Sequence, residues 1–81
     1  MAASRAEIEE WFDVGKAGGA THMIVVCDTF DWEDYPVYVT EYQDVNEMVP
    51  KYQTNMQKVM EVYNLSMDKA EQMAEDRAFN L

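Results

Sequence analysis

The fold is decided by a short run of sequence, Thr21-His22-Met23-Ile24-Val25-Val26-Cys27, whose two alternating faces are both apolar apart from His22. A β-branched run of this kind is typical of a central strand that is covered on both sides. An acidic and aromatic loop follows from Asp28 to Tyr35, and Pro36 is then expected to open a second strand, Val37–Tyr42. Proline is acceptable at a strand start because its missing amide need not pair there. We expect the two strands to be antiparallel neighbours.

The second strand has a simple alternation of faces. One face is predicted to carry Val37 and Val39, and the other Tyr38, Thr40 and Tyr42.

A helix is predicted before the central strand, over Arg5–Ala17. Ser4 and Glu7 have the spacing of a capping box, in which each side chain bonds the backbone amide of the other residue. Ile8, Trp11 and Phe12 then form one apolar stripe. Gly18-Gly19 ends the helix, because glycine adopts the left-handed cap conformation at little cost.

Two interpretations are open for the middle of the chain. Asp44 is a plausible N-cap for a second helix, but Pro50 predicts that this helix is kinked or short and ends near Thr54-Asn55. The stretch 56–65 fits a helical stripe by periodicity. We favour a third strand there, because its Val-Met-Glu-Val-Tyr run is rich in β-formers and because a two-stranded sheet is marginally stable.

The C-terminal part predicts a last helix capped by Ser66, with Asp68 in its first turn. One face of this helix would carry Met67, Ala70, Met73, Ala74 and Arg77 or Ala78. Phe79 and Leu81 are expected to fold back as an apolar tail. The whole chain, 1–81, is therefore predicted to be one α+β domain with a three-stranded sheet, about three helices and the order α-β-β-α-β-α.

Composition excludes several classes of protein. The chain has 81 residues, of which 48% are hydrophobic, which is enough for one small core. It has no stretch of roughly 20 apolar residues that would span a membrane, and no secretory signal pattern at its start. Its one cysteine cannot form a disulfide framework or a cysteine-rich zinc site. We expect a cytoplasmic protein.

The net charge of −10 is the strongest feature of the composition. A negative field of this size repels nucleic-acid phosphates and anionic membranes, so direct binding to either is not expected. It keeps a small protein soluble, and it also attracts a basic partner protein.

The candidate binding residues lie together in the loop after the central strand: Asp28, Asp31, Trp32, Glu33, Asp34 and Tyr35. Four carboxylates are hard-cation ligands, but their spacing lacks the alternation and the glycine of a calcium loop. They also suit a solvated turn in which carboxylates cap local amides. Trp32 lies between two acids and is expected to be partly exposed, as an anchor for a partner.

Other chemistry in this region is rejected. The Val25–Asp31 segment is superficially similar to the opening of the haloacid dehalogenase phosphatases, but its aspartates lie three residues apart rather than two. Cys27 and His22 are five residues apart, on opposite faces of one strand and roughly 16 Å from each other, so His22 cannot act as the base for Cys27. A buried structural thiol is expected.

Two segments, Thr21–Val39 and Met56–Tyr63, resemble a family of short hypothetical proteins that occur in bacteriophages and bacterial genomes. The resemblance covers most of the chain and carries no catalytic motif. It implies a phage or mobile-element accessory protein that works in the cytoplasm of a bacterial host. In size and acidity the chain is similar to phage anti-defence proteins.

These observations lead to a non-enzymatic binding protein without a cofactor, whose partner is a basic host protein and which can form a homodimer. The alternatives are an oligomeric sponge for a nucleotide signal and a small metal-dependent hydrolase. A sponge would need its few basic residues to gather around phosphate, and these are Arg5, Lys16, Lys51, Lys58, Lys69 and Arg77.

Overall fold

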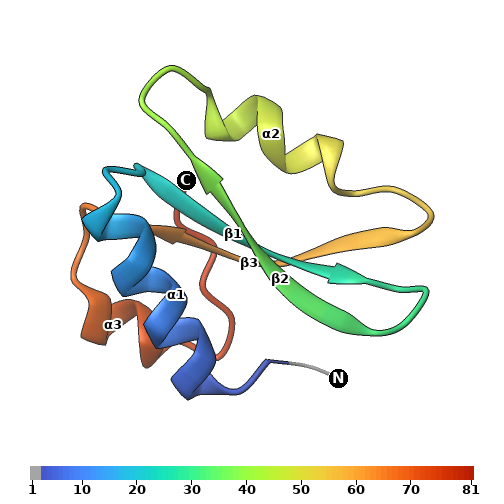
Figure 1. The fold of residues 1–81 in the computed structure, drawn as a ribbon, viewed down its shortest axis with the longest axis horizontal. Helices are drawn as coiled ribbons and strands as arrows, with labels where there is room; N and C mark the ends of the chain where they lie inside the picture. The colour runs from blue at the N-terminus through green and yellow to red at the C-terminus, as the bar shows by residue number, and fades with distance from the viewer. Residues whose placement is uncertain (1–2) are drawn as a thin grey trace.

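A three-stranded antiparallel sheet forms the centre of the computed structural model, which describes residues 3–81. The elements are α1 (Arg5–Ala17), β1 (His22–Asp28), β2 (Glu33–Val39), α2 (Val45–Lys51), β3 (Gln57–Asn64) and α3 (Lys69–Met73). The strand order β2-β1-β3 places β1 in the middle. α1 and α3 lie on one side of the sheet and α2 lies on the other (Figure 1). The predicted α+β class, element order and central strand are confirmed.

The bounds of α1 follow from its caps, as predicted. Ser4 Oγ accepts a hydrogen bond from the Glu7 amide at 3.2 Å, and the Glu7 carboxylate accepts one from the Ser4 amide at 3.4 Å. Ile8 and Phe12 are buried beneath the helix. After the helix, Gly19 adopts a φ of +83°, which a side chain would disfavour.

α1 approaches the sheet closely at Gly15. A Cβ atom on Gly15 would lie 2.5 Å from Tyr38 Cε1, so only glycine lets the Tyr38 ring pack here. The Tyr38 hydroxyl donates a hydrogen bond to the Trp11 carbonyl at 2.8 Å. This contact fixes α1 against β2.

The bounds predicted for the second strand are wrong. β2 begins at Glu33, inside the expected loop, and ends at Val39. The loop is shorter than expected because hydrogen bonds to Asp28 close it as a tight turn. Pro36 is tolerated inside β2 because this strand is at the edge of the sheet. Val37 and Val39 do share one face, opposite Tyr38. The last three residues of the predicted strand, 40–42, lie outside β2, in the segment that follows it.

α2 is short rather than kinked. The Asp44 carboxylate accepts a hydrogen bond from the Asn46 amide at 2.9 Å, which confirms the predicted N-cap. The helix ends at Lys51 rather than near residue 54, because the Tyr52 amide turns to the Val49 carbonyl at 3.1 Å in a tighter final turn.

β3 occupies the stretch whose interpretation was open, and it is a strand as we favoured. Val25 of β1 pairs with Glu61, whereas Val26 pairs with Val59, so Met60 is an extra residue in β3. This β-bulge shifts the alternation of faces along the strand. As a result the Glu61 and Tyr63 side chains both reach Arg5 of α1.

The last helix is shorter than predicted and has a different cap. The Asp68 carboxylate accepts from the amides of Ala70 at 2.8 Å and Glu71 at 3.2 Å. Ser66 is not the cap, since its hydroxyl donates instead to Asn64 Oδ1 at 2.6 Å. The helix therefore begins at Lys69 and ends at Met73.

The chain then returns along the outer side of β3. The Val62 amide donates to the Ala78 carbonyl at 3.0 Å, and the Asn80 amide donates to the Val62 carbonyl at 2.9 Å. Ala78 is fully buried, whereas Phe79 and Leu81 are 50% and 49% exposed. The segment folds back as predicted, but a parallel bridge to the backbone of β3 holds it in place. The prediction that the Phe79 and Leu81 side chains form an apolar tail is wrong, because both are about half exposed.

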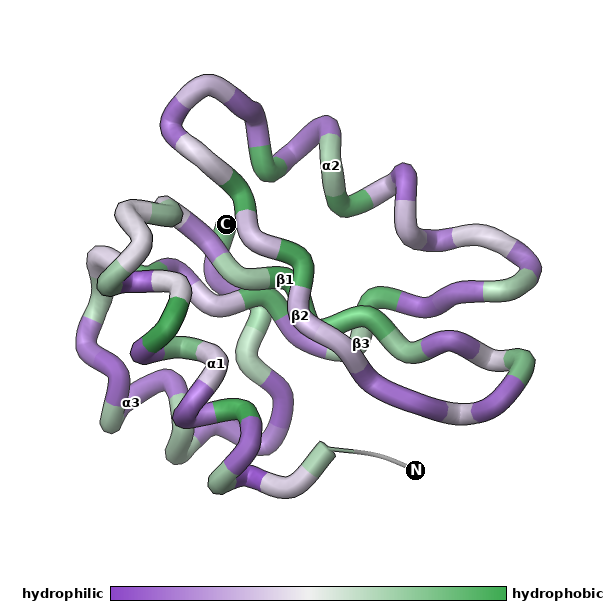
Figure 2. Tube along the Cα trace, in the orientation of Figure 1, coloured by the Kyte–Doolittle hydropathy of each residue, from purple (hydrophilic) through white to green (hydrophobic). Residues whose placement is uncertain are grey.

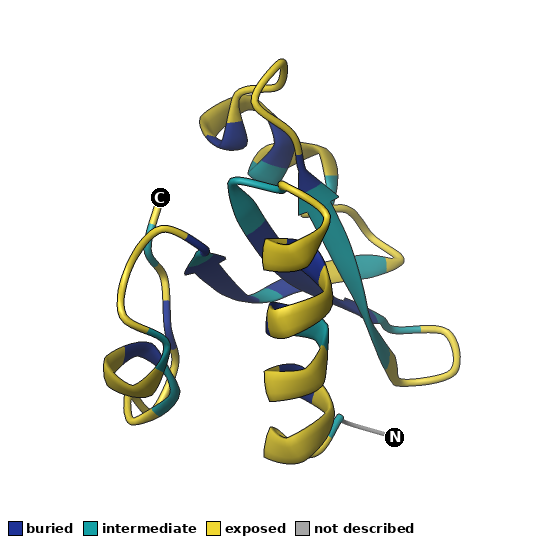
Figure 3. Cartoon of the chain, turned by 60° about the vertical axis from the view of Figure 1, so that its left-hand side comes forward, coloured by how far each residue is buried: buried dark blue, intermediate teal, exposed yellow. Residues whose placement is uncertain are grey.

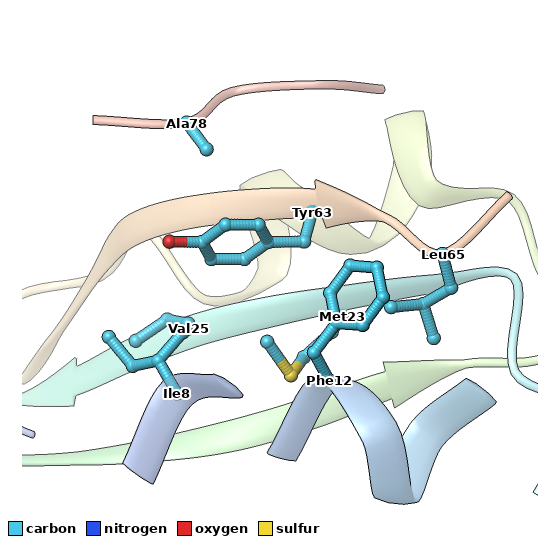
Figure 4. Close-up of a cluster of buried hydrophobic side chains, with 7 residues drawn as sticks. All are labelled: Ile8, Phe12, Met23, Val25, Tyr63, Leu65 and Ala78. Atoms are coloured by element: carbon cyan, nitrogen blue, oxygen red, sulfur yellow. The ribbon is translucent and has the colours of Figure 1, made fainter. Parts of the chain in front are cut away.

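Two apolar clusters cover the two faces of the sheet. The cluster between the sheet, α1 and the C-terminal segment contains Ile8, Phe12, Met23, Val25, Tyr63, Leu65 and Ala78 (Figure 4). The cluster under α2 contains Ile24, Val26, Val39, Val45, Met48, Val59 and Val62. Figure 2 shows that hydrophobic residues are concentrated along the strands of the sheet. Figure 3 shows that the side of α1 that faces away from the sheet is exposed. The two-sided apolar run of β1 supplies both clusters.

Candidate functional site

The turn between β1 and β2 carries the residues that the sequence singles out. Asp28 pairs with Glu33 across the base of this turn. The Asp28 carboxylate accepts a hydrogen bond from the Phe30 amide at 2.9 Å, and the Asp28 carbonyl accepts one from the Trp32 amide at 2.7 Å. Trp32 has a φ of 59°, a left-handed conformation that is uncommon for any residue except glycine, asparagine or aspartate. Asp28 is therefore the structural centre of the turn.

A second loop lies beside this turn. The Thr29 amide donates to the Met56 carbonyl at 2.9 Å, and the Thr29 hydroxyl donates to the Asn55 carbonyl at 3.4 Å. These bonds place Met56 beside the turn that carries Phe30 and Trp32. The three side chains are 78%, 60% and 52% exposed for Phe30, Trp32 and Met56. We call these three residues the apolar tip.

The four predicted carboxylates do not converge. Cys27 lies on the α1 side of β1, with Met23 and Val25, and its cross-strand partner Asp34 shares that side. Asp28 and Glu33 belong to the opposite side, and Asp31 lies in the exposed turn between the strands. Within residues 3–81, no group of three or more His, Cys, Asp or Glu side chains is placed to hold a metal ion.

Besides Asp28, two more of the six candidates, Asp34 and Tyr35, make bonds that hold the fold. The Asp34 carboxylate accepts a hydrogen bond from the Ala3 amide at 3.0 Å and so holds the start of the described chain against β2. The Tyr35 hydroxyl bonds to the side-chain amide of Gln57 on the α2 side of the sheet. Burial, followed by the nearby Tyr52 and Asp28, raises the pKa of Tyr35. The exposed members of the set are Asp31, Trp32 and Glu33.

His22 and Cys27 lie at opposite ends of β1, as predicted. Cys27 is 6% exposed, and its burial, reinforced by the nearby Asp34 carboxylate, raises the pKa of the thiol. That is the environment of a structural cysteine, not of an activated nucleophile. His22 Nδ1 lies 3.0 Å from the Thr21 hydroxyl, while Nε2 is buried with no hydrogen-bond partner among the described residues. Burial lowers the pKa of His22.

A buried polar cluster was missed in the sequence. Glu61, which is 8% exposed, accepts hydrogen bonds from Arg5 at 3.2 Å, from the Tyr63 hydroxyl at 2.9 Å and from the Ala78 amide at 3.2 Å. Arg5 also donates to the Glu75 carbonyl at 3.0 Å. The sequence signal for this cluster is a charged residue, Glu61, within an apolar run. The face to which its side chain points depends on the bulge at Met60. The cluster joins α1, β3 and the C-terminal segment, so we assign it to the fold.

The basic residues do not form one site in the chain. They are spread over both ends of α1, the end of α2, β3, α3 and the segment after it. Arg5 is paired with Glu61, and Lys69 lies 3.0 Å from Asp13.

The comparisons with known proteins add no relative. No family model, curated protein or solved structure matches this chain. The resemblance to short phage and bacterial proteins therefore stays a prediction. No helix within residues 3–81 is both long and apolar enough to cross a membrane.

Proposed function

We propose that this chain is a non-enzymatic binding protein that attaches to a basic partner protein through the apolar tip and the carboxylates beside it. The observation that carries the proposal is the position of Trp32. A large aromatic side chain stands 60% exposed on a left-handed backbone position, where glycine would be the ordinary residue. An unfavourable conformation that is held by its surroundings is a reason to look for function at that residue.

The surroundings of Trp32 fit a basic partner. Its sequence neighbours Asp31 and Glu33 are both exposed, and the chain has a net charge of −10. Aromatic anchors surrounded by charges are typical of the residues that dominate protein interfaces. The charges would speed the encounter and select the partner, and the rings would hold it. In its biological setting we propose a phage or mobile-element accessory that blocks a basic component of the bacterial host.

The two alternatives have less support. A metal-dependent hydrolase needs carboxylates that converge, and the carboxylates of this turn are divided between two faces of the sheet. A nucleotide sponge needs gathered cations, whereas Arg5 and Lys69 already pair with carboxylates of the chain.

The test is a pull-down from bacterial lysate at low and high salt, with mass spectrometry of retained proteins and small molecules. Two variants remove the proposed contacts: Trp32→Gly, which suits the left-handed backbone, and the double variant Asp31→Lys/Glu33→Lys. The matched control is Glu9→Lys/Glu10→Lys, which makes the same change of charge on the exposed side of α1.

We expect one or more basic proteins to bind the unmodified chain and the control, to elute with salt, and to be lost with both tip variants. Retention that is the same for all four proteins would refute the role of the tip. A nucleotide that is released only on denaturation would favour the sponge instead.

A further inference from the structure

The two outer edges of the sheet are treated differently. On β3, the Asn64 amide and carbonyl bond to the side-chain amide of Gln72, both at 2.8 Å. The Val62 amide and carbonyl bond to residues 78–80, and the Val59 amide donates to the Gln53 side chain at 3.1 Å. Strand addition at this edge is therefore blocked by the chain itself.

Within residues 3–81, the outer edge of β2 is not paired with a strand. Alternate residues of a strand direct their backbone groups to the same side. The Val39 carbonyl accepts from the Thr21 amide at 2.7 Å, on the β1 side, so the backbone groups of Val39 and Val37 face inward. Those of Asp34, Pro36 and Tyr38 then face outward. No other strand of residues 3–81 pairs with that side, and only the Pro36 position lacks a donor.

A hollow lies next to one end of this open edge. It has a volume of about 260 Å³ and is lined by Val14, Gly15, Gly18, Ala20, Tyr38 and Thr40. Sites for drug-sized ligands are larger, roughly 300–1,000 Å³, so this hollow suits a single apolar side chain. Val14 at its rim is 57% exposed.

The other end of the same edge is acidic. Asp31 and Glu33 are exposed where β2 begins, seven and five residues before Tyr38. Five residues of strand span about 17 Å. One extended segment could therefore contact both ends at once.

We propose that the outer edge of β2 takes an extended segment of the basic partner as an added antiparallel strand, with an apolar side chain in the hollow and a basic side chain five residues later at the acidic end. The inference rests on the proposed function and names the segment that it recognises. We infer a basic segment as the occupant because the acidic end of the edge is negatively charged. We infer an antiparallel direction because both strand pairs of this sheet are antiparallel. Strand addition with a side-chain pocket is a recurring mode of peptide recognition.

The direct test uses an end-capped peptide, Ser-Leu-Thr-Thr-Thr-Thr-Lys-Ser, and its order-reversed form, Ser-Lys-Thr-Thr-Thr-Thr-Leu-Ser. Binding is followed by nuclear magnetic resonance titration of the intact protein. We expect the first peptide to shift the amide signals of Asp34 and Tyr38, and the reversed peptide to bind at least about tenfold more weakly.

Two further comparisons separate strand addition from simple attraction. N-methylation of the peptide at its Leu removes a donor that faces β2, and should weaken binding at least about tenfold. N-methylation at the next residue faces solvent and should change binding less than about twofold. Val14→Gln, an exposed position on α1, should weaken the Leu peptide without affecting a peptide in which Ser replaces Leu.

The outcomes are distinct. If both peptide orders bind equally and neither N-methyl group matters, while Asp31→Lys/Glu33→Lys still abolishes partner capture, strand addition is refuted and the proposed function stands. A captured partner whose binding is insensitive to a β2-edge peptide at saturation also refutes it. Signals of Asp34 and Tyr38 that shift with protein concentration alone, together with a dimer in sedimentation, would assign the edge to a second copy of this chain and overturn the proposal.

Discussion

Gln72 should be one of the main determinants of stability, although it is a polar residue on a five-residue helix. Its side chain is 1% exposed and replaces a neighbouring strand, because Oε1 accepts from the Asn64 amide and Nε2 donates to the Asn64 carbonyl. Nε2 also lies 3.2 Å from the Asp68 carbonyl. Oε1 also accepts a hydrogen bond from Asn80 Nδ2 at 3.1 Å. The variant Gln72→Leu roughly keeps the volume and removes all four bonds.

The size of the effect follows from what is left unpaired. A buried backbone group without its partner costs about 1–3 kcal/mol. The Asn64 amide would lose its partner, whereas the Asn64 carbonyl would keep the hydrogen bond from the Met67 amide at 3.1 Å. Asn64 is half-buried, so water replaces part of the loss, and the added apolar surface of leucine offsets a further part. We expect the free energy of unfolding to fall by about 1–2 kcal/mol. A chain of this length is stabilised by roughly 4–12 kcal/mol in total.

Urea denaturation followed by circular dichroism measures this change, and amide hydrogen exchange locates it. The Asn64 amide should lose its protection in Gln72→Leu, whereas the exposed neighbour variant Glu71→Leu should change neither quantity. A loss below about 0.5 kcal/mol, with the Asn64 amide still protected, would show that Gln72 does not close this edge.

Two further predictions concern the packing of buried groups. Because burial lowers the pKa of His22, the unfolded chain binds the proton more tightly, so stability should fall as pH drops below about 6.5. His22→Gln should flatten that part of the pH profile of urea midpoints, and an unchanged profile would contradict the assignment. Gly15→Ala should lower the melting temperature, because the clash with the Tyr38 ring, about 1–3 kcal/mol, exceeds a helix-propensity gain of about 1 kcal/mol. Gly18→Ala is the control, since its nearest contact would be an ordinary 3.4 Å, and equal melting temperatures for the two variants would refute the clash.

The sequence was informative where local signals and the hydrophobic pattern agreed. The Ser4 and Glu7 capping box placed α1 to the residue, and the two-sided apolar run after Thr21 placed β1 in the centre of the sheet. The stretch 57–64 could be assigned only from context, because its helical periodicity is partly produced by the bulge at Met60. Periodicity fails where a strand contains an extra residue, since the faces no longer alternate.

The site was harder to predict because proximity depends on register. Pro36 was taken as a strand start, so the turn was drawn four residues too long and Glu33 and Asp34 were placed in it. Nothing local shows that Met56 lies beside the turn with Phe30 and Trp32, because hydrogen bonds from Thr29 join that turn to a loop more than twenty residues away. The role of Gln72 is likewise visible only once residues 64 and 72 are seen to lie side by side.

The register also divides the six candidate residues into two kinds, and this division bears on how the binding hypothesis is tested. Asp28 and Asp34 are occupied by amides of the chain, so their removal would weaken the fold as well as the charge. Asp31 and Glu33 are exposed and can change sign without breaking such a bond within the described chain. A charge-reversal experiment that included all four carboxylates of the turn would therefore confuse loss of the turn with loss of the interface. Only the pair that flanks Trp32 separates attraction for a basic partner from the stability of the hairpin that presents it.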